Sequence, residues 1–164
     1  MLEIKENFIM LEKVFNEIVK ELNTKLNITP VLYGSFGLGR ALEKNLDPKD
    51  IDLLVPKKYL EEKWSVFKQV VELMGFRLKD LREHEFERRG VSIGFSYEED
   101  LMPFAGVGFD DLKVVSELDA HFKVLSLEDY LACYEKSSKD GYRKETRMKN
   151  DQEKISLIKQ KVNE

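Results

Sequence analysis

The chain has 164 residues, of which 42% are hydrophobic and 35% are charged, so it is long enough for one compact core and short for two independent domains. Its net charge of -4 and pI of about 5.4 argue against a long nucleic-acid duplex as partner, which would select a basic surface. No run of about 18 apolar residues is present to span a membrane, and the first residues carry charges where a signal peptide is apolar, so we expect a cytoplasmic protein.

Helical and extended patterns alternate along the first half of the chain. Apolar residues recur at steps of three and four where we expect helices, and short apolar runs bounded by turn residues mark the strands. The expected elements are a helix over 4–26, a strand over 31–33, a helix over about 35–44, a strand over 51–55 and a helix over 57–74 that is capped by Gly75.

The second half begins with further strands and ends in helices only. We expect a strand over 76–79, a hairpin of 83–88 and 91–96 around Arg89-Gly90, a short helix over 98–104, strands over 112–115 and 121–124, and helices over 126–137 and about 142–162. This order predicts an α/β (α+β) fold with a mixed β-sheet flanked by helices. We expect residues 1–125 to form the core and 126–164 a C-terminal helical extension packed on the same domain.

The chemically informative segment lies between the first two strands. Gly34 ends the first strand, which allows the backbone to approach a ligand closely, and Ser35 begins a helix whose dipole favours an anion. Asp50 and Asp52 lie at positions i and i+2 of the second strand, so their carboxylates project from one face while Ile51 points into the core. Paired carboxylates suit magnesium, which binds one or two of them together with phosphates and water.

Each of these signals is weak alone, because Gly-Ser pairs and Asp-x-Asp triplets are common and a strand end can carry aspartates for solubility. Together, residues 28–96 resemble the catalytic core of the DNA polymerase beta-like nucleotidyltransferase superfamily. The downstream helices look like the variable extension of its small members, such as the aminoglycoside and minimal nucleotidyltransferases. The resemblance implies the nucleotidyltransferase fold, with Gly34 and Ser35 holding the triphosphate of a nucleoside triphosphate. It also implies Asp50 and Asp52 as ligands of magnesium, generally two ions.

The family generally supplies a third carboxylate from a later strand, and this chain departs from that pattern. The outward positions of 91–96 carry Ser92, Gly94 and Ser96 instead of an acid. If Arg89-Gly90 is a two-residue loop, Glu85 lies directly opposite Gly94 on the same face and can substitute for the missing acid. The alternative is that Glu85 belongs only to the solvent-exposed face of its strand.

Two cationic regions are further candidates for nucleotide binding. Arg40 lies one turn into the helix after Gly34-Ser35, where it can contact phosphate or be an ordinary exposed helix residue. Lys136 and the run Arg147-Met148-Lys149-Asn150-Asp151 are similar to the basic residues that close the nucleotide site in small nucleotidyltransferases. A solvated helix face with salt bridges explains the same residues.

Three functional interpretations follow. The first is a magnesium-dependent nucleotidyltransferase that transfers a nucleoside monophosphate, from ATP or another nucleoside triphosphate, to a small molecule, a protein or an RNA end. The second is a nucleotide-binding protein that has lost turnover and works with a protein partner, as in a toxin and antitoxin pair; the missing acid at Gly94 supports it. The third is a structural domain without a site. Asp50→Asn and Asp52→Asn separate them, because they abolish magnesium-dependent nucleotide binding only where the carboxylates hold the metal.

Overall fold

The computed structural model describes residues 2–138 and 145–164. The α-helices are α1 (Leu2–Leu26), α2 (Gly34–Leu42), α3 (Lys57–Leu60), α4 (Trp64–Leu73), α5 (Leu101–Ala105), α6 (Leu127–Ser138) and α7 (Glu145–Val162). The strands are β1 (Val31–Tyr33), β2 (Asp50–Val55), β3 (Arg77–Asp80), β4 (Glu85–Arg88), β5 (Val91–Tyr97), β6 (Lys113–Glu117) and β7 (Ala120–Val124). Two 3-10 turns, η1 (Glu98–Asp100) and η2 (Phe109–Asp111), flank α5.

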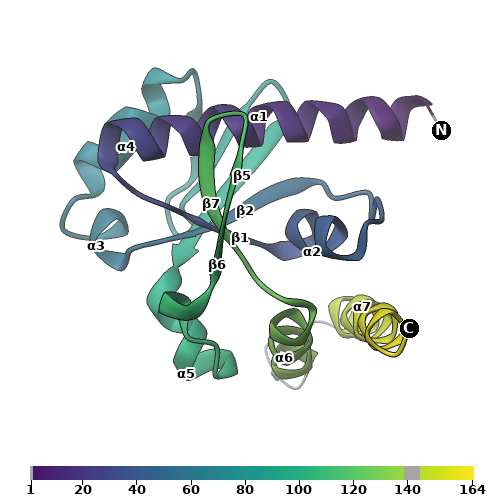
Figure 1. Cartoon of the computed structure of the whole chain (residues 1–164). Helices are drawn as coiled ribbons and strands as arrows, with labels where there is room; N and C mark the ends of the chain where they lie inside the picture. The colour runs from purple at the N-terminus through teal and green to yellow at the C-terminus, as the bar shows by residue number, and fades with distance from the viewer. Residues whose placement is uncertain (1, 139–144) are drawn as a thin grey trace.

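All of these strands join one mixed sheet of seven strands in the order β3-β4-β5-β2-β1-β7-β6. Strand β2 pairs antiparallel with β1 and parallel with β5, so it lies in the centre of the sheet. Helices flank the sheet, with α1 extending along it and α6 lying beside α7 (Figure 1). The expected α/β fold with a mixed sheet is therefore confirmed.

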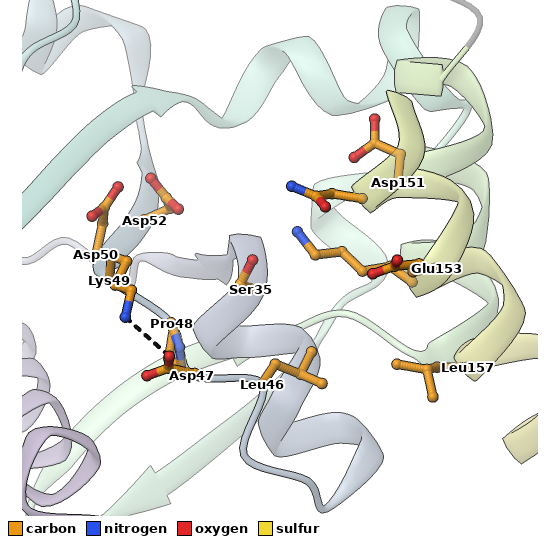
Figure 2. Close-up of a pocket in the computed structure, with 12 residues that line it drawn as sticks. Ser35, Leu46, Asp47, Pro48, Lys49, Asp50, Asp52, Asp151, Glu153 and Leu157 are labelled. Carbon is orange, nitrogen blue, oxygen red and sulfur yellow. Dashed lines mark hydrogen bonds and ion pairs between the residues drawn. The ribbon is translucent and has the colours of Figure 1, made fainter. Parts of the chain in front are cut away.

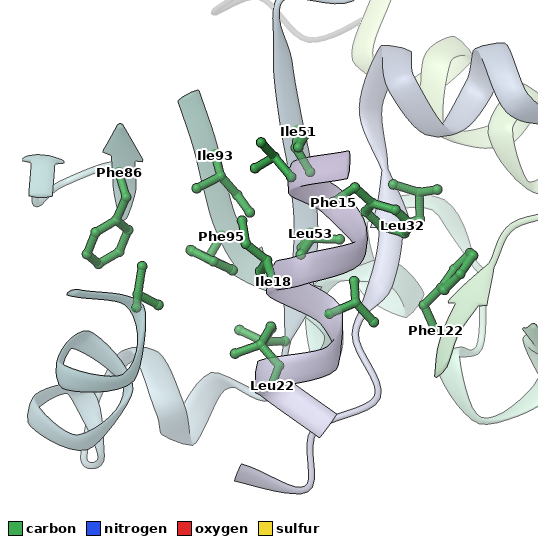
Figure 3. Close-up of a cluster of buried hydrophobic side chains, with 14 of the residues drawn as sticks. Phe15, Ile18, Leu22, Leu32, Ile51, Leu53, Phe86, Ile93, Phe95 and Phe122 are labelled. Atoms are coloured by element: carbon green, nitrogen blue, oxygen red, sulfur yellow. The ribbon is translucent and has the colours of Figure 1, made fainter. Parts of the chain in front are cut away.

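One face of the sheet is covered by α1 and α4 and carries the larger hydrophobic core. Phe15, Ile18 and Leu22 of α1 recur at helical spacing and are buried over the sheet (Figure 3). Beneath them, alternate residues of β2 and β5 face the same way, and among them Ile51 and Ile93 are fully buried. The residues between them, including Asp50 and Asp52, consequently point to the other face.

The second face is covered by α5, α6 and α7 together with part of α2. Leu38 of α2, Tyr130 of α6 and Ile158 of α7 are buried in one apolar cluster with Val31 of β1. The hydroxyl of Tyr130 donates a hydrogen bond of 3.2 Å to the carbonyl of Leu32, which ties α6 to the central part of the sheet. The C-terminal helices therefore form a wall beside the face that carries Asp50 and Asp52.

The helix expected over 57–74 is in fact two helices, and this prediction was wrong in that respect. The chain turns between α3 and α4, where the N–H of Lys63 donates to the carbonyl of Lys58, five residues back instead of four. The turn lets Tyr59 donate a hydrogen bond to the carbonyl of Leu26, while the Trp64 ring packs at 5.2 Å edge-on to His84. Tertiary packing thus overrides a continuous helical pattern. None of the described helices is long and apolar enough to cross a membrane.

Candidate active site

Asp50 and Asp52 lie side by side at the start of the central strand. Between them Ile51 is fully buried against α1, as the alternation of the strand requires. Asp52 is in register with Tyr33 of β1 on one side and with Gly94 of β5 on the other. The pair is therefore held by a strand that has hydrogen-bonded neighbours on both edges.

Gly34 brings the β1–α2 turn against the carboxylate of Asp52. Its φ is +70°, a conformation that glycine adopts without steric cost. A methyl group added at Gly34 would lie only 2.2 Å from Oδ2 of Asp52. Glycine at this position allows Asp52 to lie against the first turn of α2, where Ser35 and the N-terminal N–H groups of the helix are found.

The carboxylates repel one another because they share a partly enclosed site. Burial, followed by the neighbouring charges of Asp50 and Glu85, raises the pKa of Asp52 to about 6. Burial and the charge of Glu85 also raise the pKa of Asp50 above its usual value. Lys154 of α7 acts in the opposite direction on Asp52, lowering its pKa. A bound cation would relieve this repulsion, since it stabilises both ionised carboxylates.

Glu85 lies where the hairpin register predicts it. Arg88 pairs with Val91, and Glu85 is directly opposite Gly94. The row across the sheet is thus Glu85, Gly94, Asp52, and the three residues line one cavity of about 410 Å³. The Glu85 carboxylate is 3.4 Å from Nζ of Lys79 on β3. Within residues 2–138 and 145–164, no cluster of three or more His, Cys, Asp or Glu side chains is arranged to hold a metal ion. Asp50 and Asp52 are therefore the pair available to bind a metal ion, and Glu85 lies farther along the same row, beyond Gly94.

Helix α7 closes the site from the opposite side, and Lys154 on it is the residue that the sequence interpretation missed. A cavity of about 720 Å³, which we call the large cavity, separates Ser35, Asp50 and Asp52 from Asp151 and Glu153 of α7 (Figure 2). Lys154 lines the same cavity. Nζ of Lys154 lies 5.1 Å from the ring centre of Tyr134 on α6. The sequence signal for Lys154 was weak, since the residue belongs to a heavily charged helix and only its spacing from the buried Ile155 and Ile158 marks the inner face.

A smaller cavity of about 340 Å³, which we call the phosphate cavity, connects these features. Its lining includes Gly34, Ser35, Asp52, Tyr134 and Lys154. It therefore combines the N-terminus of a helix, a hydroxyl group, a carboxylate that can hold a metal and an ammonium group. These are the groups that bind a polyphosphate in proteins.

The structure does not bring Arg40 to this site. Its guanidinium forms ion pairs with Glu12 of α1, at 2.6 Å, and with Glu117 of β6. It also lies over the ring of Phe15, 5.5 Å from the centre. These contacts hold α1, α2 and β6 together, so Arg40 takes no part in the site that we propose below.

Lys136 is exposed on α6 and lines a separate cavity beside the phosphate cavity. Lys136 is therefore close to the candidate site, but it does not line the cavities that Asp50 and Asp52 line. The side chains of Arg147 and Lys149, which belong to the same basic region of the sequence, lie outside the described residues. Asn150 and Asp151, at the end of the same run, line the large cavity.

No protein-family model matches the chain. A relative at sequence level is "Uncharacterized protein YnaI" of Bacillus subtilis (strain 168), with 44% identity over 149 residues that cover 89% of this chain and 96% of the relative. The chain belongs to the same family as YnaI.

Solved structures show the fold of this YnaI-family protein. An antigenic nucleotidyltransferase-like protein from Paracoccidioides brasiliensis has a TM-score of 0.58 and 15% identity, covering 90% of this chain and 74% of that one. ANT(2")-Ia, crystallised in complex with adenylyl-2"-tobramycin, has a TM-score of 0.55 and 12% identity, covering 93% of this chain and 89% of that one. The YnaI-family chain thus has the fold of nucleotidyltransferases.

Proposed function

We propose that the protein is a magnesium-dependent nucleotidyltransferase that transfers a nucleoside monophosphate from a nucleoside triphosphate to a hydroxyl acceptor. The observation that carries the proposal is the contact between Gly34 and Asp52, which joins a helix N-terminus to a pair of carboxylates. The neighbour ANT(2")-Ia was crystallised with a nucleotide-modified small molecule, which supports the same reaction class and a small-molecule acceptor.

The residues of the candidate site are suited to binding a divalent metal ion. Asp50 and Asp52 would hold it, because they present hard oxygen ligands from one strand face. Burial and the neighbouring carboxylates raise the pKa of both groups, an effect that a bound cation would offset. When bound, magnesium supplies charge neutralisation for the oxygens of the transferred phosphate. The N-terminus of α2 and Ser35 bind the β- and γ-phosphates, and Lys154 provides a positive charge across the phosphate cavity.

In the proposed reaction Glu85 accepts the proton of the acceptor. It lies on β4, two strands from β2, on the side of Asp52 away from Gly34 and Ser35. The acceptor oxygen forms a bond to the α-phosphorus, the bond from that phosphorus to the bridging oxygen of the β-phosphate breaks, and pyrophosphate leaves with the electron pair. The acceptor's proton passes to the Glu85 carboxylate, so the charges balance.

Calorimetric titration tests the proposal. Each nucleoside triphosphate is titrated into the protein with and without magnesium, and we expect magnesium-dependent binding that Asp52→Asn weakens at least tenfold. Asp47→Asn is the matched control. It removes one charge from the wall of the same large cavity but lies in the turn before β2, where its φ of 52° is one that asparagine tolerates. If no triphosphate binds, or if both variants lose binding equally, the proposal is wrong.

A second candidate is a nucleotide-binding protein without turnover, which the glycine at position 94 and the ion pair between Glu85 and Lys79 favour. In that case binding survives Glu85→Gln, and no pyrophosphate is released with any acceptor. Pyrophosphate release that falls in Glu85→Gln while triphosphate affinity is retained supports the enzyme instead.

A further inference from the structure

A cavity of about 450 Å³, which we call the apolar cavity, lies where β2 and β5 end. Its walls are mainly carbon atoms and include Leu54 of β2 together with Leu101, Pro103 and Phe104 of the α5 segment. Two charged residues, Asp100 and Lys136, also line it. Its volume is within the range of small-molecule sites, and its mixture of apolar walls with few polar groups is typical of them.

The apolar cavity is continuous with the candidate active site. Tyr33, Leu54 and Ser96 line both the apolar cavity and the phosphate cavity. Leu54 also follows Asp52 by two residues on the same strand, so the two side chains project from the same face about one strand repeat apart. A ligand whose phosphates lie at Gly34 and Asp52 therefore has a direct path into the apolar cavity.

The geometry of the proposed transfer determines which part of the nucleoside triphosphate can extend into the apolar cavity. In an in-line transfer the acceptor and the leaving pyrophosphate lie on opposite sides of the α-phosphorus. The pyrophosphate lies toward α2, which follows β1, and the acceptor lies toward Glu85 on β4; this axis runs across the strands. The nucleoside leaves this axis at an angle, and two cavities, toward the two ends of β2, adjoin the phosphate cavity.

Two directions along the strands are open to the nucleoside, and they differ in chemistry. Toward the start of β2 the large cavity is lined by the charged residues Asp47, Lys49 and Asp50 as well as by Leu46 and Pro48. Toward the end of β2 the walls are Leu54 and the apolar residues of α5. The faces of a nucleobase are apolar and stack on rings, so the second direction suits it better.

We propose that the apolar cavity is the nucleobase subsite, an inference that rests on the proposed function. The half-buried Phe104 ring supplies a surface for the face of the base. Lys136 donates to, and Asp100 accepts from, the polar edge of the base. The sequence analysis named Lys136 as a candidate for nucleotide binding, and the proposed subsite gives it a specific role.

The subsite is tested by comparing ATP with tripolyphosphate, which lacks the nucleoside. With magnesium present, wild-type protein binds ATP more tightly than tripolyphosphate. Phe104→Ala weakens ATP binding about tenfold and leaves tripolyphosphate binding unchanged, because stacking is lost and the phosphate contacts remain. Met102→Ala is the matched control, since Met102 lies exposed on the same short helix and does not line the apolar cavity.

Two further measurements test the subsite without Phe104→Ala, so the result does not depend on whether that variant folds. Lys136→Met changes an exposed residue and should reduce the difference in binding affinity between ATP and tripolyphosphate. Photolysis with 8-azido-ATP, followed by mass spectrometry, labels the segment 97–104 in wild-type protein, and excess ATP prevents the labelling.

The outcomes separate the two proposals. If tripolyphosphate and ATP bind equally and the label falls elsewhere, the phosphate site stands and the base subsite is refuted. A loss of ATP affinity in Met102→Ala as large as in Phe104→Ala refutes the subsite as well. If neither ligand binds with magnesium, the proposed function itself fails.

Discussion

Gly34 and Gly106 share a left-handed backbone, with φ of +70° and +73°, but differ in their surroundings. A methyl group at Gly34 meets Asp52 at 2.2 Å, whereas at Gly106 nothing lies within 4 Å. Both alanine variants carry the backbone cost of about 1–2 kcal/mol. We expect only Gly34→Ala to abolish magnesium-dependent triphosphate binding, as measured by calorimetry, because it displaces Asp52. Equal retention of binding in both variants would show that the Gly34–Asp52 contact is unimportant.

Glu98, after β5, predicts a pH dependence of stability. It is 7% exposed, and burial raises its pKa from 4.5 to about 7, with Lys123 offsetting part of the effect. The folded state therefore holds this proton more tightly than the unfolded state does, and Glu98 reduces the free energy of unfolding as the pH rises from about 4.5 to 7. Glu98→Gln should raise that free energy by about 1–3 kcal/mol at pH 8 and have little effect below pH 4.5.

Urea unfolding at several pH values measures this difference. Glu72→Gln, at an exposed position of α4, serves as the control for the loss of a carboxylate. A Glu98→Gln stability that follows the wild-type curve at every pH would show that Glu98 ionises freely in the folded protein.

Arg40 connects three segments that are distant in the sequence. Its ion pairs reach Glu12 on α1 and Glu117 on β6, and its side chain is only 20% exposed. Arg40→Met leaves both carboxylates without their partner, so we expect a loss of about 1–3 kcal/mol in the free energy of unfolding. Triphosphate affinity should be unchanged. A selective loss of that affinity, with stability preserved, would restore Arg40 as a phosphate-binding residue.

The β4–β5 hairpin determines which glutamate can serve the site. Glu85 is opposite Gly94, whereas Glu87, on the same strand face, is opposite Ser92 and pairs with Arg77 at 2.6 Å. Glu85→Gln should lower the rate of pyrophosphate release by roughly 10²–10⁴, the usual contribution of a general base. Glu87→Gln should change it little. Equal rates in the two variants would remove Glu85 from the mechanism.

Contacts within one hairpin could be predicted from the sequence, whereas contacts between distant segments could not. The register of Glu85 with Gly94 follows from a two-residue turn, in which Arg89 and Gly90 have φ of 49° and 82°, so counting along the chain was sufficient. The placement of Lys154 across the cavity from Asp52 depends on how α7 packs over the sheet, and no local pattern encodes that arrangement. The break between α3 and α4 likewise arises from packing.

The sheet separates two hydrophobic clusters that share its strands. Ile18 lies in the cluster under α1, and Ile158 lies in the cluster under α6 and α7. Val31 of β1 belongs to the second cluster and its neighbour Leu32 to the first, so neither cluster can be lost without exposing β1. We therefore predict that residues 126–164 unfold together with the core instead of as a separate unit.

Trp64 makes this prediction measurable, because the single tryptophan packs on the first cluster, across the sheet from α7. In urea, its fluorescence and the far-UV circular dichroism should change at the same midpoint in the wild-type protein. Ile158→Ala, which leaves a cavity beneath α7, should lower the free energy of unfolding by about 2–5 kcal/mol, and Ile18→Ala by a similar amount. With one cooperative unit, Ile158→Ala shifts the fluorescence midpoint as much as the dichroism midpoint. If it moves the dichroism alone, the C-terminal helices unfold independently and Lys154 reaches the site only while they are docked.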